Sequence, residues 1–155
     1  MKDSINKVMS FSETELVCEM SDGTVVKRVG GSLSWRHNNP GNLIFTEFTK
    51  ECGALQAGLR RLSIFPNFFM GDTAHRILLF SGVRPYINMT IEAAIAKYAP
   101  AYDGNDPVKY ADFIAHQIGV KKDVVLKDLT EVQKSLMIAS MQRYEGFKVG
   151  QIIKV

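Results

Sequence analysis

Residues 35–43 read WRHNNPGNL and place three side-chain amides beside one rigid turn. Pro40 fixes φ near the value that the second position of a β-turn needs, and Gly41 accepts the positive φ that a type II turn needs next. The amides belong to Asn38, Asn39 and Asn42. They either cap local backbone groups, which is the commoner role of a single asparagine, or face a ligand rich in hydroxyl and acetamido groups.

Length and composition predict one soluble domain over residues 1–155, because 46% of the residues are hydrophobic and 23% are charged. No charge-free apolar run approaches the roughly 18 residues of a spanning helix, so membrane insertion is not expected. The N-terminus, MKDSINKVMSFSETE, lacks the apolar core of a signal peptide. A protein that acts outside the cytoplasm would then need another route of export.

The charge is mild, with a formal net charge of +3 and a pI near 8.9. Lysines and arginines are spread along the chain, with only short pairs such as Arg60-Arg61 and Lys121-Lys122, so nucleic acid is not indicated. A slightly basic surface equally suits an anionic polymer such as the bacterial cell wall.

The cysteines and histidines show no metal-binding pattern, and no metal or cofactor is expected. His37, His75 and His116 are scattered, without HxxxH or HExxH spacing. Cys18 and Cys52 have two interpretations of equal weight. They are either two buried small hydrophobic residues, or a disulfide that ties the N-terminal strands to the turn region in an oxidising compartment.

The predicted fold is mainly α, an α+β domain with a small N-terminal β-hairpin. Residues 1–14 read as a polar leader, and residues 15–28, ELVCEMSDGTVVKR, as two β-prone runs around the tight turn Asp22-Gly23. Proline and N-cap signals then predict three helices. These are FFMGDTAHRILLF after Pro66, IEAAIAKY after Thr90 and PVKYADFIAHQI after Asp106.

A fourth helix is predicted over residues 131–145. Thr130 and Gln133 fit a capping box at its start, and Gly146 is a natural C-terminal stop. Residues 136–141 read LMIASM and are apolar on almost every side, which is typical of a central helix that is packed all round. The prediction therefore places Glu145 at the end of a buried helix.

A carboxyl group at such a position can act as an acid. Desolvation and the negative end of the helix dipole both disfavour the anion of Glu145, so the group is expected to hold its proton near neutral pH. Glycosidic cleavage needs such a proton donor, because the leaving oxygen must be protonated as the C–O bond breaks. The plainer alternative is an ion pair between Glu145 and Arg143 or Lys148 at the helix end.

Several segments in order resemble a phage and prophage family labelled virion structural protein or peptidoglycan hydrolase. The segments are HNNPGNL (37–43), FTKECGA (48–54), IFPN (64–67), TIEAAIAKYAP (90–100), NDPVKYADFIA (105–115) and RYEGF (143–147). Residues 21–42, SDGTVVKRVGGSLSWRHNNPGN, also resemble cell-wall-degrading effectors of type VI secretion systems. The resemblance covers roughly residues 16–150, although His37 stands where the family usually has Asn and Ala101 replaces the second proline of a Y-A-P-P element.

A second, shorter resemblance predicts how these segments are arranged in the fold. RYEGFK, residues 143–148, is similar to the segment around the catalytic acid of phage lysozymes, which there lies near the N-terminus. Together the two resemblances imply a lysozyme-like domain in a circularly permuted arrangement, in which the acid-bearing helix comes last. This hypothesis requires Glu145 to lie near Asn39 and Asn42.

The resemblance implies an enzyme that cleaves the glycan strands of peptidoglycan, with Glu145 as general acid. The class includes muramidases, glucosaminidases and lytic transglycosylases. Glu47 is the candidate for the second catalytic carboxylate, with Glu51 as an alternative. Candidate substrate-binding residues are Asn38, Asn39 and Asn42 for acetamido groups, Trp35 and Tyr98 for sugar rings, and Asp106, which equally suits a helix cap.

Delivery and partners follow from the same resemblance. The enzyme would be an antibacterial effector toxin or a phage lytic enzyme, released by a type VI apparatus or during lysis to act in the periplasm of a target bacterium. An effector would have an immunity protein that plugs its cleft. Two rival hypotheses remain: a structural protein that binds the wall without cleaving it, and an amidase that uses Cys18 or Cys52 as nucleophile.

Overall fold

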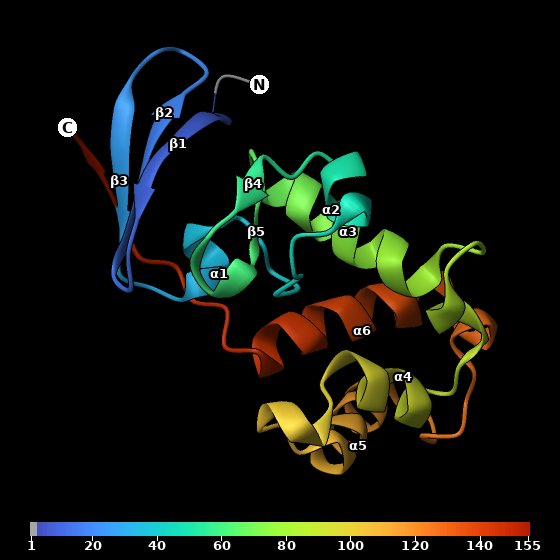
Figure 1. The fold of residues 1–155 in the computed structure, drawn as a ribbon. Coiled ribbons are helices and arrows are strands. Elements are labelled where there is room, and N and C mark those ends of the chain that lie inside the picture. Colours follow the sequence, from blue (N-terminus) through green and yellow to red (C-terminus); the bar gives the residue numbers. More distant parts are fainter. Residues whose placement is uncertain (1–2) are drawn as a thin grey trace. The chain divides into compact units, whose positions relative to one another are not determined.

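The computed structural model describes residues 3–155, and the chain divides into two compact units. The first unit contains Met1–His75 together with Glu145–Val155, and the second contains Arg76–Tyr144. Helices and an antiparallel sheet occur together in the described chain, so the predicted mainly helical α+β class is confirmed (Figure 1). The single-domain prediction stays a prediction, since two compact units can belong to one domain.

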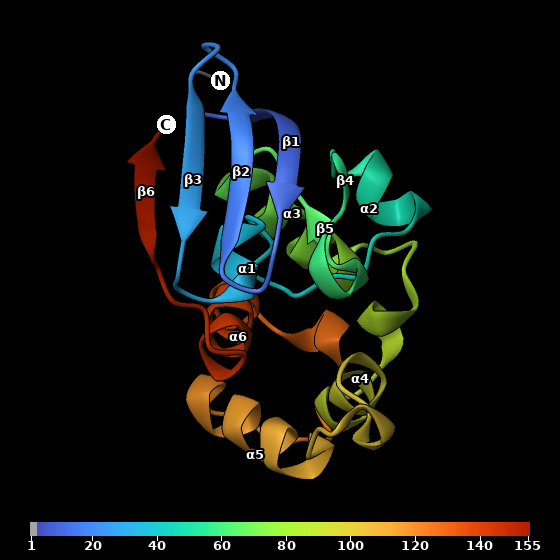
Figure 2. The same cartoon turned by 60° about the vertical axis from the view of Figure 1, so that its left-hand side comes forward.

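A four-stranded antiparallel sheet belongs to the first unit. Its strands follow the order β1-β2-β3-β6, as Figure 2 shows. They are β1 (Ile5–Phe11), β2 (Glu15–Met20), β3 (Val25–Val29) and β6 (Gln151–Lys154). The predicted hairpin is confirmed, because β2 pairs with β3 in a register that sets Cys18 opposite Val26. Gly23 supplies the positive φ of 87° at its tip.

The prediction of a polar leader over residues 1–14 is wrong, because β1 occupies half of it. β1 is an edge strand, and among its residues only Ile5 is buried. Its sequence, INKVMSF, mixes apolar and polar residues without regular alternation, so it shows no clear period of two. The backbone N–H of Ile5 also donates to the carbonyl of Pro66 at 2.8 Å, which ties β1 to the rest of the first unit.

Five short elements connect the sheet to a longer helix, α3 (Phe68–Phe80). The short elements are α1 (Leu33–Arg36), α2 (Glu47–Glu51), β4 (Gln56–Ala57), η1 (Leu59–Arg61) and β5 (Ser63–Ile64). α3 begins in the first unit and runs into the second. The small core of the first unit contains Ile5, Leu16, Cys18, Val26 and Ile64.

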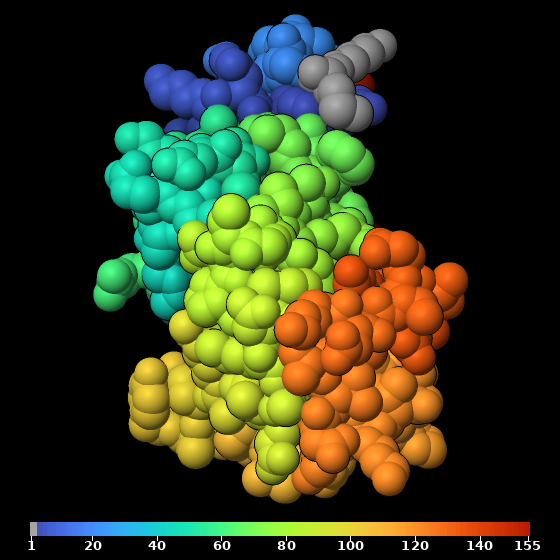
Figure 3. Space-filling model, turned by 90° about the vertical axis from the view of Figure 1, so that its right-hand side faces the viewer, coloured from blue at the N-terminus to red at the C-terminus, as the bar shows by residue number. Residues whose placement is uncertain are grey.

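The second unit is helical and contains the larger apolar cluster. Its elements are η2 (Pro85–Asn88), α4 (Ile91–Tyr98), η3 (Ala101–Asp103), α5 (Pro107–Ile118), η4 (Leu126–Asp128) and α6 (Glu131–Tyr144). Thr90 caps α4 and Asp106 caps α5, as predicted. Figure 3 shows the yellow-green surface of the segment around η2 beside the orange surface of η4, and the N–H of Leu126 donates to the carbonyl of Met89 at 2.9 Å.

The last helix is confirmed in extent but not in burial. The capping box of Thr130 and Gln133 is present, with bonds of 2.9 and 3.1 Å, and α6 ends at Tyr144. Only one side is buried, because Val132 is 70% exposed and Leu136 45% exposed. The apolar run led to the error, since apolar residues such as Leu136 also occupy exposed positions on a protein surface. No helix within residues 3–155 has the length and apolar character needed to cross a bilayer.

Candidate functional site

The segment over residues 35–43 forms a buried turn, although not the type II turn that its sequence predicts. The N–H of Asn42 donates to the carbonyl of Asn39 at 3.0 Å, and Asn42 itself, rather than Gly41, has positive φ. Gly41 is needed for close packing instead. A Cβ at this position would lie 2.7 Å from Cγ of the buried His75 on α3.

Asn38 and Asn39 do not face a ligand. Asn39 is fully buried; its Nδ2 donates to the carbonyls of Leu43 (2.9 Å) and Ser63 (3.0 Å), and its Oδ1 accepts from the N–H of Leu43. Asn38 is 5% exposed and donates to the carbonyls at residues 65 and 66. The prediction that these two amides bind substrate is therefore wrong, and the local capping alternative holds, because loop backbone inside a protein needs side-chain partners.

Asn42 differs from the other two asparagines, because its amide meets Glu145. Nδ2 of Asn42 donates to Oε2 of Glu145 at 3.3 Å, across 103 positions of sequence. Both side chains are partly exposed. Within residues 3–155, Glu145 forms no ion pair, and Arg143 donates to Gln117 instead. The expected contact between the turn and the acid is present, and the expected ion pair is not.

Two contacts fix the segment that carries Glu145 to the rest of the first unit. The ring of Phe147 lies edge-on to Phe68 of α3, with centroids 5.5 Å apart. Further along, the N–H of Ser32 donates to the carbonyl of Lys148 at 2.8 Å, and the N–H of Lys148 donates to Oγ of Ser32 at 3.0 Å. The chain on the C-terminal side of Glu145 is therefore held close to the turn.

The aromatic candidates take structural positions. Trp35 is 7% exposed, and the guanidinium of Arg28 lies 4.3 Å from its ring centroid, so it does not offer a face to a sugar. Tyr98 lies in the second unit, edge-on to Tyr86 with centroids 6.3 Å apart. Asp106, also in the second unit, accepts from the N–H of Lys109 at 3.0 Å as the cap of α5. These contacts favour core and capping roles for Trp35 and Asp106.

The second carboxylate stays a prediction. Glu47 lies in the first turn of α2, exposed to solvent, and its helix is held by the reciprocal capping of Thr46 and Thr49. Glu51 ends the same helix and is also exposed. Within residues 3–155, neither carboxylate shares a hydrogen bond with Glu145 or Asn42.

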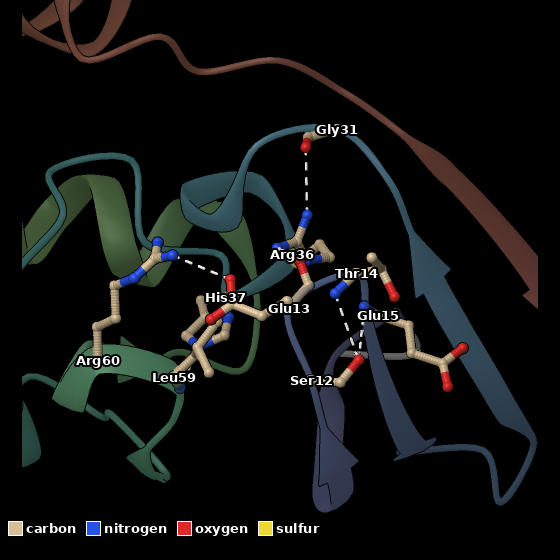
Figure 4. A network of polar contacts seen from close by, with 9 residues as sticks. All are labelled: Ser12, Glu13, Thr14, Glu15, Gly31, Arg36, His37, Leu59 and Arg60. Carbon is tan, nitrogen blue, oxygen red and sulfur yellow. Dashed lines mark hydrogen bonds and ion pairs between the residues drawn. The ribbon is translucent and has the colours of Figure 1, made fainter.

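A second polar network, missed in the sequence, supports the turn from the side of the sheet (Figure 4). The guanidinium of Arg36 donates to the carbonyls of Glu13, Gly30 and Gly31 at 3.0 to 3.2 Å. Arg60 pairs with Glu13 at 2.9 Å on the surface. Arg36 thus joins three segments, and the only sequence signal was a charged residue within an otherwise uncharged turn segment.

His37 is a buried base in this network. Its Nε2 accepts from the N–H of Leu59 at 3.1 Å, and Gly58 makes room for the ring, since a Cβ there would overlap it. Burial, followed by the charges of Arg36 and Arg28, lowers the pKa of His37 to about 4. The ring is therefore neutral at neutral pH.

Neither cysteine forms a disulfide within residues 3–155, so the disulfide alternative is not realised. Cys18 is fully buried on β2, and burial raises the pKa of its thiol. A raised thiol pKa leaves little thiolate, which disfavours Cys18 as a nucleophile. Cys52 is partly exposed and occupies the C-cap of α2.

Within residues 3–155, no three or more His, Cys, Asp or Glu side chains are grouped in a way that could hold a metal ion. A scan against protein-family models gave no match. A search of curated proteins gave none either.

Proposed function

We propose that this protein cleaves the glycan strands of peptidoglycan, with Glu145 as the general acid. The observation that carries the proposal is the hydrogen bond from Asn42 to Glu145. It joins the amide-rich turn and the terminal Glu-Gly motif, the two parts of the sequence whose resemblance to wall-degrading proteins first suggested the activity.

The geometry suits proton donation. The amide of Asn42 engages one oxygen of Glu145, Oε2, and within residues 3–155 no hydrogen bond occupies Oε1. A proton on Oε1 can pass to the glycosidic oxygen while Asn42 holds the carboxyl group in place. As the C–O bond breaks, the leaving sugar keeps that proton and positive charge develops on the other ring.

The fate of that positive charge defines the enzyme class. If Glu47 is the second carboxylate, it acts as base or nucleophile, and its separation from Glu145 in the substrate complex decides between inversion and retention. If no second carboxylate takes part, a hydroxyl of the sugar itself attacks that ring and passes its proton to the Glu145 carboxylate, which gives an anhydro product, as in a lytic transglycosylase. Both routes need Glu145.

The biological setting of the proposal is an antibacterial effector or a phage lytic enzyme. Its substrate would be the wall in the periplasm of a target bacterium, and an effector would be neutralised in the producing cell by an immunity protein. A partner that covers Asn42 and Glu145 would block the acid directly. Co-purification of such an inhibitor with the wild type but not with a variant at this site would support the effector setting.

The deciding experiment is digestion of purified peptidoglycan by the wild type and by Glu145→Gln, with soluble fragments resolved by mass spectrometry. Glu131→Gln is the matched control, because Glu131 lies exposed at the start of α6, the helix that ends just before Glu145. Disaccharide-peptides from the wild type and the control, and none from Glu145→Gln, are expected. Free stem peptides would assign an amidase, and no release at all would leave a wall-binding protein.

A further inference from the structure

A pocket of about 450 Å³ opens on the inner face of the four-stranded sheet, within the first unit. Apolar side chains of Met20, Val26 and Ile152 line it, together with the cations Arg28 and Lys154. The strand register explains this grouping, since Ile152 pairs with Arg28 and Lys154 pairs with Val26 across β3 and β6. Paired residues in an antiparallel sheet point to the same face.

Arg28 is a buried cation that pairs with no carboxylate within residues 3–155. It is 8% exposed, and its hydrogen bonds within residues 3–155 both come from Nη2, to the carbonyl of Trp35 (2.7 Å) and to Oδ1 of Asn38 (3.1 Å). Nε is buried without a partner in the described chain. A guanidinium has five N–H donors in a fork that fits a carboxylate, so Arg28 keeps unused capacity for an anion.

Burial acts against this charge but does not remove it. Desolvation lowers the pKa of Arg28, while Cys18 opposes that effect. Arginine nevertheless stays protonated in proteins, so the first unit holds a positive charge that only neutral acceptors and the Trp35 ring offset. Binding of an anion at Arg28 would supply the missing countercharge.

The pocket also has acidic residues in its lining. At the hairpin end it is lined by Asp3 and by Asp22, whose carboxylate accepts from the N–H and hydroxyl of Thr24 at 3.0 and 2.6 Å. Thr24 and Arg28 are four positions apart along the chain, which is roughly 13 Å in a strand. A ligand with an anionic end and an N–H-bearing end, separated by a short apolar body, matches this arrangement.

We propose that this pocket binds the C-terminal end of a short peptide with small apolar side chains. The carboxylate lies on Arg28 and Lys154, the side chains contact Val26 and Ile152, and the peptide amino groups point toward the acidic end. Three extended residues span roughly 10 Å, so a tripeptide covers most of the roughly 13 Å between the two ends. The proposal does not depend on Glu145 or on glycan cleavage.

The test is a titration of the full ¹⁵N-labelled chain with trialanine, followed by ¹H–¹⁵N correlation spectra. Trialanine amide, which lacks the terminal carboxylate, and acetate, which lacks the peptide, are the matched probes. We expect saturable shifts of the amides of Val26 and Ile152 and of the Arg28 side-chain N–H with trialanine, at a Kd roughly in the millimolar range for so small a ligand. At least tenfold weaker binding is expected for either control probe.

Two neighbouring residues of β6 provide the protein controls. Ile152→Glu places a carboxylate at the pocket, and Ile153→Glu places the same charge on the opposite face of the strand, where the side chain is 46% exposed. Loss of saturable shifts in Ile152→Glu and their retention in Ile153→Glu are expected. Equal weakening by both variants, equal binding of the amide, or equal binding of acetate would overturn the proposal.

Discussion

The side-chain amide of Asn42 donates to Oε2 of Glu145, although 103 positions separate the two residues in the sequence. The contact lies within the first compact unit, to which the C-terminal segment returns after the second unit is complete. A chain can satisfy this contact only after the segment after Tyr144 has reached the turn. The chemistry proposed for Glu145 therefore depends on the return of the C-terminal segment to the first unit.

Replacing Asn42 tests its role as a positioning residue. Asn42→Gly removes the amide while keeping the backbone relaxed, because glycine accepts the φ of 51° found there. A hydrogen bond to a charged or reacting group contributes about 1.5–3 kcal/mol, so kcat for glycan cleavage should fall roughly 10- to 100-fold. KM should change little. Release of muropeptides at the wild-type rate by Asn42→Gly would show that the contact has no catalytic role.

Asn39 should matter for stability. Asn39→Ala leaves the carbonyl of Ser63 and the N–H of Leu43 without the side-chain partner they have in this fully buried position, whereas the carbonyl of Leu43 keeps its bond from the N–H of Ser63. Each unsatisfied group costs about 1–3 kcal/mol, so a loss of about 3 kcal/mol or more in the free energy of unfolding is expected. Urea unfolding measures it, with Asn42→Gly as the milder comparison. A change below about 0.5 kcal/mol would contradict the structural role.

The local part of this fold could be predicted from the sequence, because its signals act over a few residues. The hairpin around Gly23 and the caps at Thr90, Asp106 and Thr130 depend on neighbours two to three positions away. β6 could not be predicted in the same way. It pairs with β3 across more than a hundred positions, and a four-residue strand exposed along its length carries no periodic signal.

The contact between Asn42 and Glu145 could be predicted from the sequence, but the roles of Asn38 and Asn39 could not. The proximity of Asn42 and Glu145 was predicted from the resemblance, because motifs that occur in the same set in related folds are expected to lie in the same places in space. The roles of Asn38 and Asn39 could not be read in this way, since an asparagine that caps buried backbone and one that faces a ligand look identical in sequence. Only the positions of their carbonyl partners distinguish them.

A glycine pair tests the packing of α3 on the turn. A Cβ on Gly71 would overlap the carbonyl oxygen of Asn38, a backbone atom that cannot move aside cheaply. Gly71→Ala should therefore destabilise the protein by about 1–3 kcal/mol or more. Gly82→Ala is the control, because nothing lies within 4 Å of a Cβ there and its φ is not positive. The control should be neutral or stabilising by up to about 1 kcal/mol, as measured by thermal unfolding.

The buried base His37 predicts a loss of stability in acid. Its pKa is about 4 in the folded protein and 6.5 in the unfolded chain, so between these values the unfolded state binds more protons. Stability is therefore retained above pH 6.5 and lost as the pH falls toward 4, by about 3 kcal/mol in total from this group. Chemical unfolding of the wild type and of His37→Asn, which cannot titrate, isolates the contribution. The gap between their unfolding free energies should change by that amount across the window in favour of His37→Asn at pH 4, and a gap independent of pH would contradict the assignment.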